Sequence, residues 1–124
     1  MADVRSIEQD RVAFALEHIA KVRDADAYKR ESSGFGPLVI SNGLAGAVAF
    51  AAGKWKSGFI EHLDAWIASR REFERLEGRT VLAKIARKEC DAATYRAISS
   101  ECLAYSSWLK RLARAGKRNN GTRD

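Results

Sequence analysis

The segment from Tyr95 to Leu112 carries apolar side chains at alternating steps of three and four residues. This spacing puts them on one stripe of an α-helix, in a heptad-like seam that can pack against a neighbouring helix. No part of the chain shows the apolar–polar alternation or the turn residues of a β-hairpin, so the sequence predicts an all-α fold. The seam consists of Tyr95, Ile98, Cys102, Tyr105, Leu109 and Leu112.

The first part of the chain predicts two helices separated by a polar loop. Apolar residues at three- and four-residue steps indicate a first helix from about Val4 to Tyr28. The polar stretch from Lys29 to Gly36 is typical of a loop. Pro37 then suits the first turn of a second helix, because its missing N–H would have no partner there in any case.

The second helix is apolar on almost every side, which predicts that it is the most buried element of the fold. Glycine inside a helix costs about 1 kcal/mol relative to alanine, so Gly43 and Gly46 indicate that another backbone comes close. The apolar run from Gly43 to Gly53 is too short to span a bilayer. We therefore expect no membrane partner.

Capping residues place the remaining helices. We expect Ser57 to begin a third helix, Thr80 a short fourth one and Asp91 the last, which should end at Gly116. The length of 124 residues suits one domain. We predict a single compact bundle of five to six helices, with a helical domain over residues 1–116 and a disordered basic tail over residues 117–124.

The formal net charge of +6 is unevenly distributed. Basic and acidic residues balance up to residue 62, so the excess lies in the second half of the chain, mostly after Leu109. Such a cluster favours a polyanionic partner such as a nucleic acid. Basic side chains also complement the negative C-terminal pole of a helix, so charge alone leaves both interpretations open.

The reactive residue types do not form a catalytic or metal-binding motif. His18 and His62 each neighbour a glutamate, but an HExxH motif would need a second histidine at the position of Trp66. The serines of the last predicted helix lack the strand–turn–helix setting of a nucleophile elbow, and the glycines at positions 34 and 36 follow no strand. We therefore expect no enzyme, metal site, cofactor or small-molecule substrate.

The cysteines and the first residues indicate a cellular location. Cys90 and Cys102 would lie roughly 18 Å apart along a helix, which is beyond the reach of a disulfide. Two unlinked thiols fit a reducing cytoplasm. No basic stretch leads into an apolar one, as it would in an export signal, so we expect a cytoplasmic protein.

Basic residues lie beside tryptophans at two places, in Lys54–Lys56 and around Trp108. On a helix Lys110 and Arg114 share a face, as do Arg111 and Arg114. Such a row can follow a phosphate backbone with little base selectivity. For the tryptophans we favour a place in the core or an interface. From the residues alone, the charges could equally serve only to solubilise the helix.

Two stretches resemble the small-subunit family of type III-B CRISPR (Cmr) effector complexes. The first runs from Pro37 to Phe50 and on to Lys54, with a proline, an apolar helix, an Asn-Gly-Leu step and a phenylalanine ahead of a lysine. The second has Tyr95 and Glu101 ahead of the Trp-Leu-Lys-Arg stretch of residues 108–111. The order and separation of the two stretches agree with the family, and the similarity spans about residues 10–116.

Single residues between and beside these stretches add to the comparison. Trp66 lies where the family tends to have a tryptophan. Leu112 stands where the family often has phenylalanine, and Gly36 stands where leucine is common. Both differences are tolerable in packing and neither removes a charge. Residues 70–79 match no part of the family pattern.

The resemblance implies a helical subunit without catalytic activity, whose copies stack beside a row of backbone subunits along the guide RNA–target RNA duplex. In this family, target cleavage is attributed to the backbone subunits and nucleotide cyclisation to the large subunit. The expected partners are therefore other Cmr subunits (backbone and large), further copies of the chain and the RNA duplex, in antiviral defence. Guide pairing selects the sequence, so the protein need only hold the RNA backbone.

The motif match assigns RNA contacts to four residues, and three more are added because they lie nearby in the sequence. The alternative is a helical module that bridges protein partners without touching nucleic acid, with the Tyr95–Leu112 seam as an exposed interface. The residues matched by motif are Lys54, Arg96, Lys110 and Arg111, and those added by proximity are Lys56, Arg114 and Lys117.

Overall fold

The computed structural model describes the backbone of residues 5–123 and the side chains of residues 5–115. Within this range the chain is helical and contains no strand, so the prediction of one compact all-α bundle is confirmed. The elements are α1 (Ile7–Ile19), α2 (Ala25–Lys54), α3 (Phe59–Ser69), the short 3₁₀ helix η1 (Arg71–Phe73), α4 (Val81–Ile85) and α5 (Ala92–Arg123).

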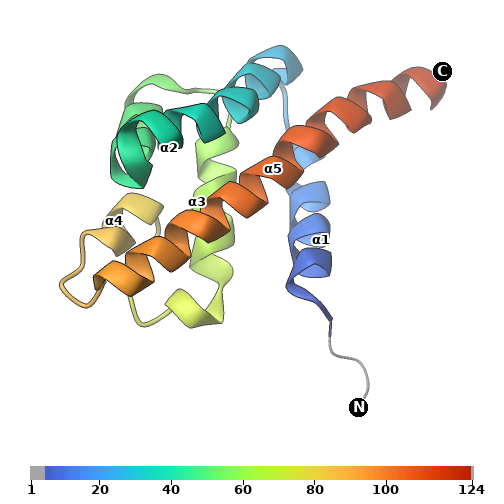
Figure 1. The fold of residues 1–124 in the computed structure, drawn as a ribbon. Coiled ribbons are helices and arrows are strands. Elements are labelled where there is room, and N and C mark those ends of the chain that lie inside the picture. The colour runs from blue at the N-terminus through green and yellow to red at the C-terminus, as the bar shows by residue number, and fades with distance from the viewer. Residues whose placement is uncertain (1–4, 124) are drawn as a thin grey trace.

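The long helix α5 runs obliquely across the molecule and contacts α1, α2 and α3 (Figure 1). It begins as predicted at Asp91, whose Oδ1 accepts a hydrogen bond of 2.8 Å from the backbone N–H of Thr94. The predicted seam faces inwards, which makes α5 the central element of the fold. Along the seam Ile98, Cys102, Tyr105 and Leu109 are fully buried, and Tyr95 and Leu112 pack at its edges.

The end of α5 differs from the prediction. The helix continues through Gly116 to Arg123, so the expected stop at Gly116 is wrong. A glycine in a helix costs only about 1 kcal/mol relative to alanine, and it therefore permits a helix end without requiring one. In Figure 1 this end of α5 projects past the other helices. The division into a domain over residues 1–116 and a tail over residues 117–124 stays a prediction.

The predicted first helix is divided into two, because the chain carries two N-caps that the sequence analysis did not use. Ser6 and Gln9 form a reciprocal capping box that begins α1, with hydrogen bonds of 2.9 and 3.1 Å. Asp24 then accepts a hydrogen bond from Ala27 N at 3.0 Å and begins α2. The chain therefore turns between Ile19 and Ala25 instead of continuing as one helix.

The loop predicted from Lys29 to Gly36 is wrong, because these residues belong to α2. Pro37 lies inside the helix and does not begin it, and its ring removes the intrahelical hydrogen bond to the carbonyl of Ser33. Burial of one face holds the helix together in spite of this loss. The buried residues follow helical steps of four, three and four through the polar stretch: Tyr28, Ser32, Phe35 and Val39.

Gly43 divides α2 into two helices that meet at a kink. Its φ of 76° and ψ of 167° are not helical, and the positive φ favours glycine. The hydroxyl oxygen of Tyr95 accepts a hydrogen bond of 3.0 Å from Ala45 N at the start of the second half. The predicted close approach of another backbone at Gly43 and Gly46 is wrong, because an added Cβ would meet only the Tyr95 hydroxyl at Gly43, at 3.9 Å, and only the Asn42 side chain at Gly46, at 3.1 Å.

The outer side of α2 is more exposed than predicted. Ile40 is 84% and Phe50 is 47% exposed, and α5 is the more central helix. Because it is longer than predicted, α2 is also the one helix in the described range that could cross a membrane by length and mean hydropathy, which reaches 1.6. Core helices pass the same test. The kink at Gly43 and the buried inner face of α2 are features of a core helix.

The turns around α3 and α4 are held by specific side chains. Thr80 caps α4 as predicted, with Oγ1 accepting from Ala83 N at 3.0 Å. The residue before α3 is Gly58 and not Ser57, whose hydroxyl donates a hydrogen bond of 2.5 Å to Glu31 of α2. The segment of residues 70–79 is held from α4 by the buried ammonium group of Lys84, which donates to two of its carbonyls.

Candidate nucleic-acid interface

Lys110 and Arg114 lie on the side of α5 that faces the first half of α2. Arg114 Nη2 donates a hydrogen bond of 3.4 Å to Ser33 Oγ. Lys110 is half-buried and borders a small hollow together with Ser33 and Ser107. The spacing of four residues predicts this shared face, and the structure confirms it for these two side chains.

Arg111 extends over the ring of Trp108, with its guanidinium carbon 5.3 Å from the ring centroid. This cation–π contact holds the planar group in place while the side chain remains exposed. Trp108 itself packs against the core, and so does Trp55, whose ring lies 5.8 Å from that of Phe59. Both tryptophans are half-buried at the edge of the core, which agrees with the expected place in the core or an interface.

Lys54 and Lys56 are exposed at the turn from α2 to α3. The carboxylate of Glu31 accepts a hydrogen bond of 3.2 Å from Lys56 N. Trp55 lies over Gly34, where an added Cβ would come within 3.7 Å of the ring. The turn is thus held against the part of α2 that Arg114 also contacts, at Ser33. Two basic groups that are distant in sequence therefore flank residues 31–34 of α2.

Two of the predicted contact residues are not placed with these groups. Arg96 lies near the start of α5, and about 21 Å of helical rise separates it from Lys110. The pKa of Asp91 is lowered, mainly by the hydrogen bonds of its carboxylate with Thr94 and to a smaller extent by the positive charge of Arg96. Lys117 belongs to α5, but its side chain lies outside the described residues.

Glu101, the acidic residue of the closing motif, has a structural role. Its carboxylate accepts hydrogen bonds of 2.7 and 2.8 Å from the Arg11 guanidinium and one of 2.9 Å from Trp66 Nε1. The hydrogen bond to Glu101 raises the pKa of Arg11. The sequence analysis missed this network. Its signal was one charged residue on the apolar side of each of two predicted helices, Arg11 in the first and Glu101 in the last, which indicates a buried ion pair.

The tyrosine of the same motif is structural too. Tyr95 accepts the hydrogen bond from Ala45, directly after the Asn-Gly-Leu step of the first motif. The two motifs that resemble the Cmr small-subunit family therefore touch each other at the kink in α2. Their basic residues Lys54, Lys110 and Arg111 take no part in this contact.

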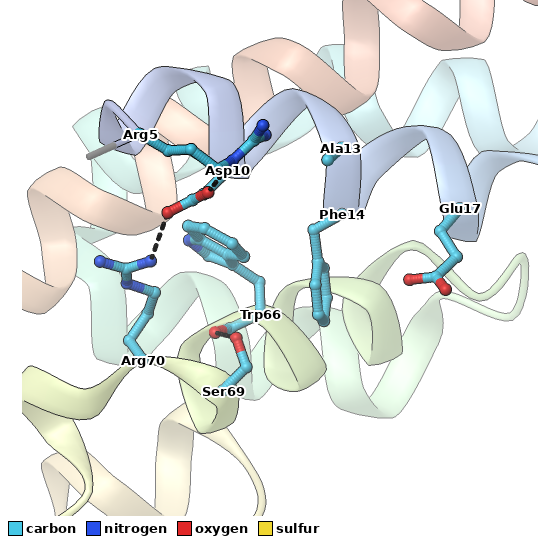
Figure 2. A pocket seen from close by; sticks show the side chains of 8 residues that line it. All are labelled: Arg5, Asp10, Ala13, Phe14, Glu17, Trp66, Ser69 and Arg70. Carbon is cyan, nitrogen blue, oxygen red and sulfur yellow. Dashed lines mark hydrogen bonds and ion pairs between the residues drawn. The ribbon is translucent and has the colours of Figure 1, made fainter. Parts of the chain in front are cut away.

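Figure 2 shows a shallow groove of about 690 Å³ that lies between α1 and the end of α3, with Asp10 at its rim. Asp10 accepts from Arg5 at 3.0 Å and lies 3.9 Å from Arg70, so both arginines of the groove are paired with a carboxylate. Arg70 covers one face of Trp66 at 4.9 Å, and Tyr105 stacks on the ring at 4.8 Å. The groove thus offers neither an unpaired cation to a phosphate nor an open ring face to a base.

The histidines lie together between α1 and α3. Their rings are 5.0 Å apart, His62 Nδ1 is 2.8 Å from the hydroxyl of Tyr28, and His18 Nδ1 is 2.9 Å from the carbonyl of Phe14. Burial, helped by the charges of His18 and Lys21, lowers the pKa of His62 to about 4, so its ring is neutral at pH 7. Across the described residues, no three His, Cys, Asp or Glu side chains are grouped to hold a metal ion.

Comparison with known proteins gives the family. The family model described as CRISPR-associated protein (Cas_Cmr5) matches residues 7–116. A curated relative, the CRISPR system Cmr subunit Cmr5 of Thermotoga maritima, is 30% identical over 106 residues, which cover 86% of this chain and 79% of the relative. No solved structure matches the chain significantly. The matched range includes both motifs and the hydrogen bond that joins them, and the chain belongs to the Cmr5 family, the small subunits of type III-B CRISPR (Cmr) complexes.

Proposed function

We propose that this chain is a non-catalytic subunit that holds the guide RNA–target RNA duplex within a cytoplasmic Cmr complex, as part of antiviral defence. The observation that carries the proposal is a division between the motif residues. Trp66, Tyr95 and Glu101 are used inside the fold, whereas Lys54 and Arg111 are exposed. Basic motif residues that remain exposed at the surface are suited to contact with a polyanion.

The two basic groups that flank residues 31–34 of α2 supply the phosphate contacts. The turn that carries Lys54 and Lys56 is bound to this segment through Trp55 and Lys56 N, and Lys110 and Arg114 approach the segment from α5, where Arg111 is exposed beside them in the sequence. Lysine and arginine at these places bind phosphate oxygens without distinguishing bases, and base pairing with the guide selects the target. The backbone and large subunits, together with further copies of this chain, complete the surface along the duplex.

Salt dependence and charge reversal test this proposal. If the isolated chain makes about four phosphate contacts, the logarithm of its affinity for single-stranded RNA falls with the logarithm of salt concentration at a slope near −3. Replacing Lys110, Arg111 and Arg114 by glutamate is expected to weaken RNA binding while circular dichroism shows unchanged helicity. Full retention of RNA by this variant would contradict the assignment of these residues.

A protein-bridging module without RNA contact is the second candidate. The seam that first motivated it is buried within the chain, but the 84% exposure of Ile40 gives it a different basis. An interface around Ile40 would be apolar and therefore far less sensitive to salt than phosphate contact. This candidate is favoured if Ile40→Asp prevents assembly while charge reversal on α5 changes neither assembly nor RNA retention.

A further inference from the structure

We propose that the hollow between α2 and α5 is a seat for one phosphate group of the RNA backbone. This inference rests on the proposed function and narrows it to a single binding site. The hollow has a volume of about 120 Å³ and lies where Pro37 interrupts the hydrogen bonding of α2. The side chains that matter for the argument are Ser32, Ser33, Ser106, Ser107 and Lys110.

Two of the serines form fixed walls. Ser32 is 3% and Ser106 is 5% exposed. Their hydroxyl protons are directed into their own helices, to the carbonyls of Lys29 at 3.2 Å and Leu103 at 3.0 Å. These two side chains therefore define the shape of the hollow and do not supply its donors.

The donors come from the other side chains at the hollow. Lys110 has no ion pair and Ser107 no side-chain hydrogen bond among residues 5–115. Ser33 Oγ accepts from Arg114, so its own proton can turn towards an incoming oxygen. Arg114 uses one N–H in that contact and has further N–H groups to offer. Lys110 and the hydroxyl-bearing Ser33 and Ser107 thus line the hollow from two helices, and the guanidinium group of Arg114 lies next to it, bound to Ser33.

This donor set fits a phosphate better than other anions. Charge-assisted hydrogen bonds to phosphate oxygens are short and strong, and the arginine fork can bind two oxygens at once. None of the described residues that line the hollow is acidic, so no carboxylate there repels an anion. The hollow also opens beside residues 32 and 33 of α2, the segment that the proposed RNA contacts flank. A phosphate held here would fix the position of the RNA backbone along α5.

The test is a nuclear magnetic resonance titration of the full chain with inorganic phosphate and, separately, with a uridine dinucleotide joined by one phosphodiester. We expect saturable amide shifts at Ser33, Gly36, Ser107 and Lys110 with both probes. Ser107→Ala removes one donor without changing charge, and alanine is favourable in a helix, so the variant keeps its fold. Ser107→Ala and Lys110→Met should each weaken binding of both probes roughly tenfold. Lys88→Met, which removes an exposed charge beyond α4, serves as the control and should change nothing.

Each other outcome overturns a defined part of the inference. Shifts that are absent, or that are unchanged in Ser107→Ala and Lys110→Met, exclude the hollow as a phosphate site. Binding of inorganic phosphate without the dinucleotide excludes RNA as its source. Either result leaves the proposed function standing if RNA is still retained through the exposed lysines and arginines. Conversely, if both probes bind in the hollow but the chain enters no RNA-bearing complex, the proposed function is contradicted and the phosphate site is not.

Discussion

The indole Nε1 of Trp66 donates a hydrogen bond of 2.9 Å to Glu101 Oε2, and both side chains are buried. The same carboxylate accepts hydrogen bonds from Nε and Nη2 of Arg11, whose side chain is only partly accessible to solvent. One side chain of α5 therefore joins α1 to α3. The ion pair of Arg11 and Glu101 is less exposed to solvent than the ion pairs of Asp10 with Arg5 and Arg70. Residues that resemble a functional motif here hold the bundle together.

Glu101→Gln is expected to lower the free energy of unfolding by about 3 kcal/mol, because it leaves the guanidinium of Arg11 without its partner. Chemical denaturation at pH 7 measures this loss. The matched control is Asp10→Asn, which removes the ion pairs of Asp10 with Arg5 and Arg70. The Asp10 side chain is 40% exposed, so this variant should change stability by about 0.5 kcal/mol or less. Equal effects of the two substitutions would show that the Glu101 network adds nothing beyond a surface pair.

Gly43→Ala and Gly53→Ala should change stability in opposite directions, although both glycines lie in α2. At Gly43 the φ of 76° and ψ of 167° lie in a region that glycine alone adopts readily, so alanine is unfavourable by about 1–3 kcal/mol. At Gly53 the backbone is helical and an added Cβ meets nothing within 4 Å, so alanine should stabilise by up to about 1 kcal/mol. Thermal denaturation of both variants measures the difference. A stabilised Gly43→Ala would mean that α2 is not kinked there.

His62 should make the protein less stable in acid. Its pKa falls from an ordinary 6.5 to about 4 on folding, so the unfolded chain binds a proton that the folded chain does not. This contribution to stability is complete above pH 6.5 and is lost as the pH falls through 4. In His62→Gln the loss of stability between pH 7 and pH 4.5 should be smaller by about 1 kcal/mol, a value reduced because solvent screens the half-buried ring.

Asp64 provides the opposite control for that experiment. Burial raises its pKa from 3.8 to about 6, in spite of the hydrogen bond it accepts from Val81 N. Its contribution is therefore present below pH 3.8 and is lost as the pH rises through 6. Asp64→Asn should steepen the loss of stability in acid. Identical pH profiles for the wild type and both variants would contradict the assigned shifts.

Lys84→Met is expected to destabilise the protein by about 2 kcal/mol. The ammonium group of Lys84 is buried and donates to the carbonyls of Phe73 at 3.2 Å and Leu76 at 2.6 Å, which methionine leaves unsatisfied. Hydrogen exchange should show faster opening of residues 70–80 in this variant. Lys88→Met, at an exposed position nearby, is the comparison and should leave exchange in this segment unchanged.

The periodicity of the sequence predicted the fold class and the buried seam of α5 correctly, because each rests on local spacing. The boundaries of α1 and α2 were wrong where two local signals competed. Pro37 and the polar residues before it indicate a loop, yet the face from Tyr28 to Val39 is buried, and packing of that face outweighs the lost hydrogen bond. Tertiary contact decided this element, and a single sequence does not contain that information.

The candidate site divides in the same way. Helical spacing predicted that Lys110 and Arg114 share a face. It could not predict that Ser33 and Gly34 lie between the two basic groups, because this depends on how α2 packs against α5. Motif resemblance placed Tyr95, Arg96 and Glu101 in one signature and assigned an RNA contact to Arg96 among them. The structure instead uses Tyr95 and Glu101 inside the fold and leaves Arg96 about 21 Å of helical rise from Lys110.

The most direct test is photo-crosslinking of target RNA carrying 4-thiouridine to this chain within a reconstituted Cmr complex. The account predicts that the wild-type chain crosslinks and that reversal of Lys110, Arg111 and Arg114 to glutamate lowers crosslinking at least about tenfold. Reversal of Arg71, Arg79 and Lys88, exposed basic residues elsewhere, should leave crosslinking unchanged. Equal crosslinking by both triple variants, or a complex that carries RNA but never this chain, would contradict the account.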